Sequence, residues 1–104
     1  MQNLTYSFAA QAAVARAAHV GVVASGDLEI LVQPPDAGHP ARRAAVRVRT
    51  SVDGFDTVWR EVLARFFDHT PLAGGWELND FGATPAVVTL RLRQAAEAAR
   101  EAQP

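Results

Sequence analysis

Residues 20–33 of this chain read Val-Gly-Val-Val-Ala-Ser-Gly-Asp-Leu-Glu-Ile-Leu-Val-Gln. Two apolar, β-branched runs, 20–24 and 28–33, flank the triplet Ser25-Gly26-Asp27, whose residue types form tight turns. The pattern predicts a β-hairpin with Ser25 at its tip. Two prolines end the second run, because proline cannot donate a hydrogen bond to a neighbouring strand.

Alternation of apolar and polar residues predicts three more strands, at 4–8, 43–50 and 76–79. In the strand at 43–50, small and apolar side chains face one way and arginines face the other, which predicts one buried and one solvent-facing side. The Ala-rich segment 9–18 is compatible with a loop or a short helix, and its pattern does not separate the two. Residues 36–40 are predicted to form an exposed loop.

Two helices are predicted from apolar side chains that recur every three or four residues. The first helix takes Asp53 as its N-cap and Asp56 in its first turn, and its apolar stripe is Val58, Val62, Leu63, Phe66 and Phe67. The second takes Thr84 as its cap and Pro85 as its first residue, and its stripe is Val88, Leu92, Ala95, Ala96 and Ala99. Apolar residues also alternate over 86–92, so a strand is the alternative there, with helix preferred.

These elements predict an α+β fold in which a small antiparallel sheet of about four to five strands packs against two helices as a two-layer sandwich. The chain of 104 residues is expected to form a single domain, 1–104. No apolar run approaches the ~18 residues of a membrane span, and the start of the chain lacks the features of a secretion signal. We therefore expect a soluble, cytoplasmic protein.

The composition excludes several kinds of chemistry. Cysteine is absent, so the chain has no disulfide, no thiolate metal site and no thiol nucleophile of its own. Neither a phosphate-binding Gly-rich loop nor a GxSxG nucleophile motif occurs. His19, His39 and His69 lie far apart in the sequence and do not have the spacing of a metal or acid–base site. No catalytic and no metal-binding residues are predicted.

The charges favour protein partners over nucleic acid or membrane. Ten basic side chains stand against eleven acidic ones, so no net field attracts a polyanion. Four arginines gather around one predicted strand: Arg42, Arg43, Arg47 and Arg49. They are expected to form a solvent-facing sheet surface, with docking of an acidic partner subunit or of prosthetic phosphates as the lesser alternative.

The segment 21–31, Gly-Val-Val-Ala-Ser-Gly-Asp-Leu-Glu-Ile-Leu, closely resembles part of the malonate decarboxylase acyl carrier protein (delta subunit) family. In that family a Gly-Ser-Gly-Asp-Leu-Glu core carries the prosthetic group, and here Ala24 stands where Gly is frequent. Two further segments agree in the same order, 47–54 and 79–85, the latter leading to Arg91-Leu92-Arg93. The resemblance spans most of the chain.

The resemblance implies a non-catalytic carrier subunit of a multi-subunit malonate decarboxylase. Ser25 would be joined by a phosphodiester to 2'-(5''-phosphoribosyl)-3'-dephospho-CoA, whose terminal thiol carries acetyl and malonyl as thioesters. Gly26 and Asp27 would flank the attachment point, and an imported thiol suits a chain without cysteine. The implied partners are the acyl transferase and decarboxylase subunits and the prosthetic-group transferase, with no nucleic acid and no membrane.

Two alternatives stay open at this point. The acyl-carrier subunit of citrate lyase uses the same kind of prosthetic group, although the agreement around 25–31 and 80–85 favours malonate decarboxylase. An α+β interaction domain without a covalent cofactor would carry the triplet Ser25-Gly26-Asp27 simply as a polar turn.

Overall fold

The computed structural model describes residues 1–35 and 42–100, which form two helices and six strands. The elements in chain order are β1 (Gln2–Ala9), β2 (Ala12–Ala13), β3 (Ala18–Val20), β4 (Leu28–Gln33), β5 (Arg43–Thr50), α1 (Asp56–His69), β6 (Leu72–Asp80) and α2 (Pro85–Arg100). The predicted loop at 36–40 lies outside the described residues. Within the described residues, neither helix is long and apolar enough to span a membrane.

The sheet has the strand order β1-β5-β6-β4-β3, and the short β2 pairs with β6 beside this path. The pairs β1–β5, β3–β4 and β4–β6 are antiparallel, whereas β5–β6 and β2–β6 are parallel. The α+β class is confirmed, but the sheet is mixed and not wholly antiparallel as predicted. The reason is that the chain passes from β5 to β6 through α1, and such a crossover brings two adjacent strands into the same direction.

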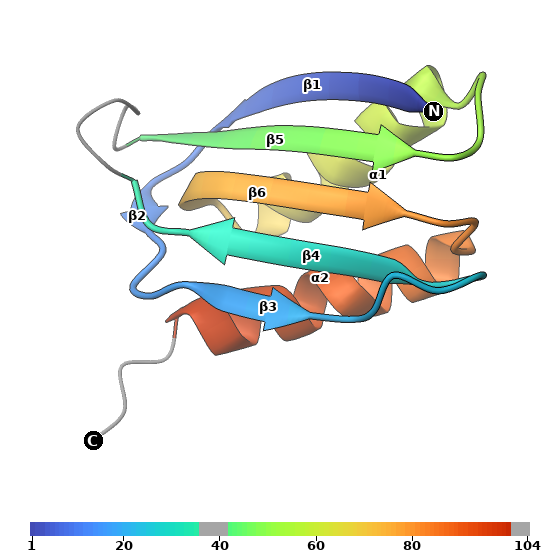
Figure 1. Ribbon diagram of the computed structural model, residues 1–104. Helices are drawn as coiled ribbons and strands as arrows, with labels where there is room; N and C mark the ends of the chain where they lie inside the picture. The colour runs from blue at the N-terminus through green and yellow to red at the C-terminus, as the bar shows by residue number, and fades with distance from the viewer. Residues whose placement is uncertain (36–41, 101–104) are drawn as a thin grey trace.

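Both helices cover the same face of the sheet, which gives a two-layer arrangement (Figure 1). In β5 the side chains facing the helices, Ala44, Val46, Val48 and Thr50, are all buried. They confirm the prediction of one buried and one solvent-facing side. The aromatic part of the core gathers around Phe67 of α1, whose ring centroid lies 5.0 Å from that of Trp76 in β6.

Helix α1 begins later than the sequence predicted, and its buried face differs from the prediction in the first turn. Gly54, at a φ of 89°, turns the chain ahead of the helix, so Asp53 lies outside it and does not act as the N-cap. Asp56 does stand in the first turn. The predicted stripe is confirmed at Leu63 and Phe67, which are buried, and Val62 and Phe66 are partly buried against the core. It is wrong at Val58, which is exposed, while its neighbour Trp59 is buried.

Helix α2 matches the preferred prediction, and the strand alternative for 86–92 is wrong. The hydroxyl of Thr84 accepts a hydrogen bond from the Val87 amide at 3.3 Å, as expected of a capping residue. All five residues of the predicted stripe are buried: Val88, Leu92, Ala95, Ala96 and Ala99.

Strand β6 is longer than the predicted 76–79 because it includes two glycines that the sequence pattern reads as a break. Gly74 has a φ of 150°, and a Cβ at this position would collide with the carbonyl oxygen of Gln33 in β4. Only glycine therefore allows β4 to approach the strand at this point. The undecided segment 9–18 contains no helix and instead forms β2, which pairs with the first residues of β6.

Candidate functional site

Ser25 lies exposed in the connection between β3 and β4, residues 21–27. The predicted hairpin is present, since β3 and β4 pair antiparallel from Ala18–Val32 to Val20–Ile30. The predicted first strand at 20–24 is wrong beyond Val20. Gly21 adopts a φ of 78° close against the carbonyl of Leu28, and this turn ends the strand.

The residues around Ser25 form a tight turn that is tied to the connection between β6 and α2. The Asp27 amide donates to the Ala24 carbonyl at 3.0 Å, and Gly26 has a φ of 80°, which a glycine adopts without strain. The Gly26 amide donates to the Phe81 carbonyl at 2.7 Å, and the Phe81 amide donates to the Asp27 carbonyl at 3.1 Å. The Gly26 amide and the Asp27 carbonyl thus anchor the turn to Phe81 by two backbone hydrogen bonds.

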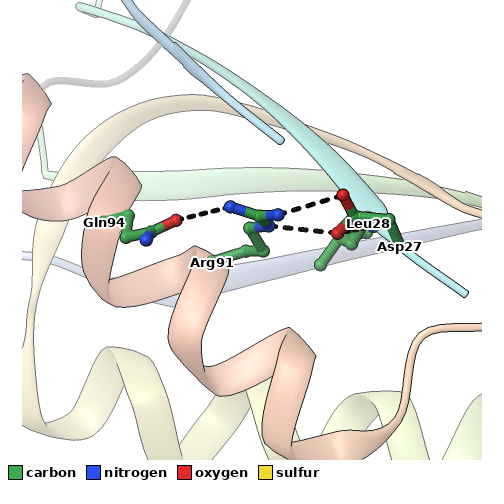
Figure 2. A network of polar contacts seen from close by, with 4 residues as sticks. All are labelled: Asp27, Leu28, Arg91 and Gln94. Carbon is green, nitrogen blue, oxygen red and sulfur yellow. Dashed lines mark hydrogen bonds and ion pairs between the residues drawn. The ribbon is translucent and has the colours of Figure 1, made fainter. Parts of the chain in front are cut away.

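Asp27 forms a bidentate salt bridge with Arg91 of α2 (Figure 2). Arg91 donates from Nε to Oδ1 and from Nη2 to Oδ2 of Asp27, each at 3.0 Å. Oδ1 also accepts the Leu28 amide at 2.7 Å, and Nη1 of Arg91 donates to Gln94 at 2.9 Å. The hydrogen bonds from Arg91, followed by that from Leu28, hold the pKa of Asp27 below its ordinary value.

The contact between Asp27 and Arg91 is the part of this site that sequence reasoning missed. The two residues are 64 positions apart, so no local spacing connects them. The signal that could have found the pair is their joint presence in the segments that carry the family resemblance. Gly26 and Asp27 were predicted as neighbours of an attachment point, and in the structure they are the two residues that fasten its turn.

The other polar candidates do not converge on Ser25. His19 bonds to Glu29 at 2.9 Å on the sheet face opposite the helices, and His69 bonds to the Arg65 carbonyl at the end of α1. His39 lies outside the described residues. In the part of the chain that the structure describes, no group of three or more His, Asp or Glu side chains could hold a metal ion.

The predicted arginine surface lies on the face of the sheet that the helices leave uncovered. Arg43, Arg47 and Arg49 are exposed along β5, and Arg42 is exposed just before it. Arg43 donates to the Ser7 hydroxyl of β1 at 2.9 Å. A solvent-facing sheet surface is therefore confirmed for these residues.

Comparison with solved structures defines the class of protein to which this fold and exposed turn belong. The fold matches a chain in the crystal structure of a Pseudomonas malonate decarboxylase hetero-tetramer in complex with malonate, with a TM-score of 0.86 and 40% sequence identity. The match covers 94% of this chain and 98% of that chain. This chain is thus a small α+β protein of the class found as one component of a larger enzyme assembly.

Comparison of sequences gives the family. The family model described as malonate decarboxylase delta subunit (MdcD) matches residues 15–99, and the chain belongs to this family. A malonate decarboxylase acyl carrier protein of Stutzerimonas stutzeri is 45% identical over 98 residues, covering 93% of this chain and 95% of the relative. One of the same description from Pseudomonas aeruginosa is 43% identical over 100 residues, covering 95% and 97%.

Proposed function

We propose that this chain is the acyl-carrier subunit of a malonate decarboxylase and that Ser25 is its attachment point. Its hydroxyl would be joined through a phosphodiester to 2'-(5''-phosphoribosyl)-3'-dephospho-CoA, whose thiol carries acetyl and malonyl groups in turn. The observation that carries the proposal is an exposed serine on a fastened turn, in a chain whose relatives are acyl carrier proteins.

The local geometry supports modification from outside. Ser25 is exposed, and the bonds that hold its turn come from Gly26 and Asp27, not from the serine side chain. A phosphate can therefore be added to the hydroxyl without breaking a contact on which the turn depends. The turn also lies at an end of the sheet (Figure 1).

The chemistry explains why a protein without cysteine would take a thiol from a cofactor. Loss of carbon dioxide from malonate leaves a carbanion, and a thioester carbonyl stabilises that charge better than a free carboxylate does. The chain itself performs no bond-breaking step in this proposal. It contributes proximity, since an intermediate held on a tether meets each active site at a high effective concentration.

The proposal places the chain in the cytoplasm with an acyl transferase subunit, decarboxylase subunits and a prosthetic-group transferase as partners. A solved relative is part of a hetero-tetramer, which supports a role among other subunits. Membership of the malonate decarboxylase family favours this assignment over the citrate lyase carrier.

The deciding experiment is intact-mass analysis of the chain purified from its own host within an active complex. We expect a mass increase equal to the phosphoribosyl-dephospho-CoA group, located at Ser25 by peptide mapping. An unmodified Ser25 in an active complex would instead support the interaction domain without a covalent cofactor. The same complex should turn over malonate, and turnover of citrate alone would overturn the assignment of the reaction.

A further inference from the structure

A cleft of about 300 Å³ opens between the first turns of the two helices, at the end of the sheet that carries Ser25. Val52, Phe55 and Val58 form its rim and are 38%, 48% and 46% exposed. Thr50 and Asp80, both buried, lie deeper in the cleft. The lining is otherwise almost wholly apolar, which is the character of a site that accepts an apolar group.

The Asp80 carboxylate links the two connections that border the cleft. Asp80 accepts a hydrogen bond from the Thr50 hydroxyl at 2.8 Å and another from the Ala83 amide at 3.0 Å. The Thr50 oxygen in turn accepts the Val52 amide at 3.1 Å. Both connections that border the cleft, β5–α1 and β6–α2, are thus fixed before anything binds, which lowers the entropy cost of binding.

The cleft adjoins the turn that bears Ser25. Gly82 lines the cleft, and the preceding residue, Phe81, exchanges two backbone hydrogen bonds with Gly26 and Asp27. Of the seven exposed large hydrophobic side chains in the described residues, six lie at this end of the sheet: Met1 ahead of β1, Val22 and Val23 in the β3–β4 connection, Val52 and Phe55 in the β5–α1 connection, and Val58 in the first turn of α1. Scattered exposed apolar residues are ordinary, but a group around a cleft indicates an interaction surface.

We propose that this cleft is the docking site for the enzyme that esterifies Ser25, and that the enzyme inserts an apolar side chain between the two helices. This inference rests on the proposed function. In the transfer step the Ser25 oxygen bonds to phosphorus of an activated phosphoribosyl donor, its proton passes to a base of the enzyme, and the bond from phosphorus to a phosphate leaving group breaks.

Geometry selects this enzyme over the other subunits as the occupant. A subunit that acts on the far end of a long arm can dock anywhere within the reach of the arm. The attaching enzyme must bring its own catalytic groups against the Ser25 hydroxyl itself. A standard interface covers about 800 Å² on each partner, a disc of roughly 16 Å radius. A disc centred on Ser25 includes the neighbouring Phe81–Gly82 connection and therefore the mouth of the cleft.

The test compares Val58→Glu with Ala64→Glu, because both place a glutamate at an exposed position of α1 but only Val58 borders the cleft. Each variant is co-expressed with the wild-type chain in the native host, and intact mass follows the fraction of each chain that gains the prosthetic group over time. We expect loading of Val58→Glu to slow by about tenfold, as for loss of a central apolar contact. Loading of Ala64→Glu should match wild type.

Two further variants protect the test against misfolding. Phe55→Ser changes a second rim residue, at the N-cap of α1 where serine is well tolerated, and Val58→Thr keeps the size and shape of valine, so both should load more slowly without melting below the wild-type temperature. Wild-type loading rates for Val58→Glu and Phe55→Ser would overturn the docking site and leave the carrier role intact. A loss of complex activity with normal loading would also overturn it, by assigning the cleft to another partner. If the wild-type chain itself gains no group at Ser25, the proposed function fails instead.

Discussion

Ser25 is held in place by the two residues that follow it. The Gly26 amide and the Asp27 side chain fasten the turn to the β6–α2 connection and to α2. Replacing Ser25 with alanine removes an exposed hydroxyl and none of these bonds. We therefore expect Ser25→Ala to change the free energy of unfolding by less than about 0.5 kcal/mol in a denaturant titration. The same variant should show no prosthetic mass and no activity of the complex, and retained activity would contradict the assignment of Ser25.

The salt bridge between Asp27 and Arg91 should affect the titration of the Asp27 carboxyl. Because Arg91 lowers the pKa of Asp27 below its ordinary value of 3.8, the Asp27 carboxyl should titrate below that value in the folded chain. A lowered folded pKa contributes stability above pH 3.8 that is lost as the pH falls from there through the folded value. Carboxyl NMR checks the midpoint, which should rise in Arg91→Ala and stay unchanged in Arg93→Ala, an exposed position on the same helix. An unchanged midpoint in Arg91→Ala would show that the ion pair does not form in solution.

The orientation of helix α1 places the Phe67 ring in the core. Phe67 is 2% exposed and its ring lies between those of Phe8, at 5.3 Å, and Trp76, at 5.0 Å, whereas Phe66 is only partly buried. We expect Phe67→Ala to lower the free energy of unfolding by about 3–5 kcal/mol. Phe66→Ala should cost less, since part of its ring already contacts water. A chemical denaturation series that gives the reverse order would show that the helix faces the sheet differently.

Strand β6 provides a matched pair of adjacent glycines. Gly74 has a positive φ and no room for a Cβ, whereas Gly75 has open space around its Cβ position on the uncovered face of the sheet. Gly74→Ala should destabilise the fold by about 2 kcal/mol or more, through backbone strain and the collision with β4. Gly75→Ala should change the free energy of unfolding by less than about 1 kcal/mol. Thermal unfolding of the two variants side by side makes the comparison, and equal melting temperatures would contradict it.

The elements that the sequence predicts well are those whose pattern is local. Strand β5 and helix α2 each alternate or recur with one consistent phase, so their buried faces follow from spacing alone. Helix α1 carries two apolar rows one residue apart, and only contact with the sheet decides that Trp59 points inward and Val58 outward. Gly74 and Gly75 suggest a break in the strand from sequence alone. The structure shows instead that the close approach of β4 leaves no room for a side chain at Gly74. For the site, turn chemistry predicts an exposed Ser25, but the Arg91 contact depends on the tertiary fold.

Both helices pack on the same face of the sheet and share one hydrophobic core with it. Trp59 of α1 and Trp76 of β6 are both buried in that core and report on it from opposite layers. Unfolding should therefore be a single cooperative transition. Tryptophan fluorescence and far-UV circular dichroism measured against denaturant should give coincident curves. Two separated midpoints would mean that the helices detach before the sheet opens.

The position of β6 in the chain has a consequence for synthesis on the ribosome. This central strand pairs with β5, β4 and β2, yet it is the last strand to be made. The earlier strands thus lack their shared neighbour until translation is nearly complete. The hydrogen bonds that hold the turn at Ser25 form later still, because Phe81 and Arg91 follow β6 in the chain. A nascent or truncated chain would present this serine without its supports, so a modifying enzyme that recognises the fastened turn would act only on finished molecules.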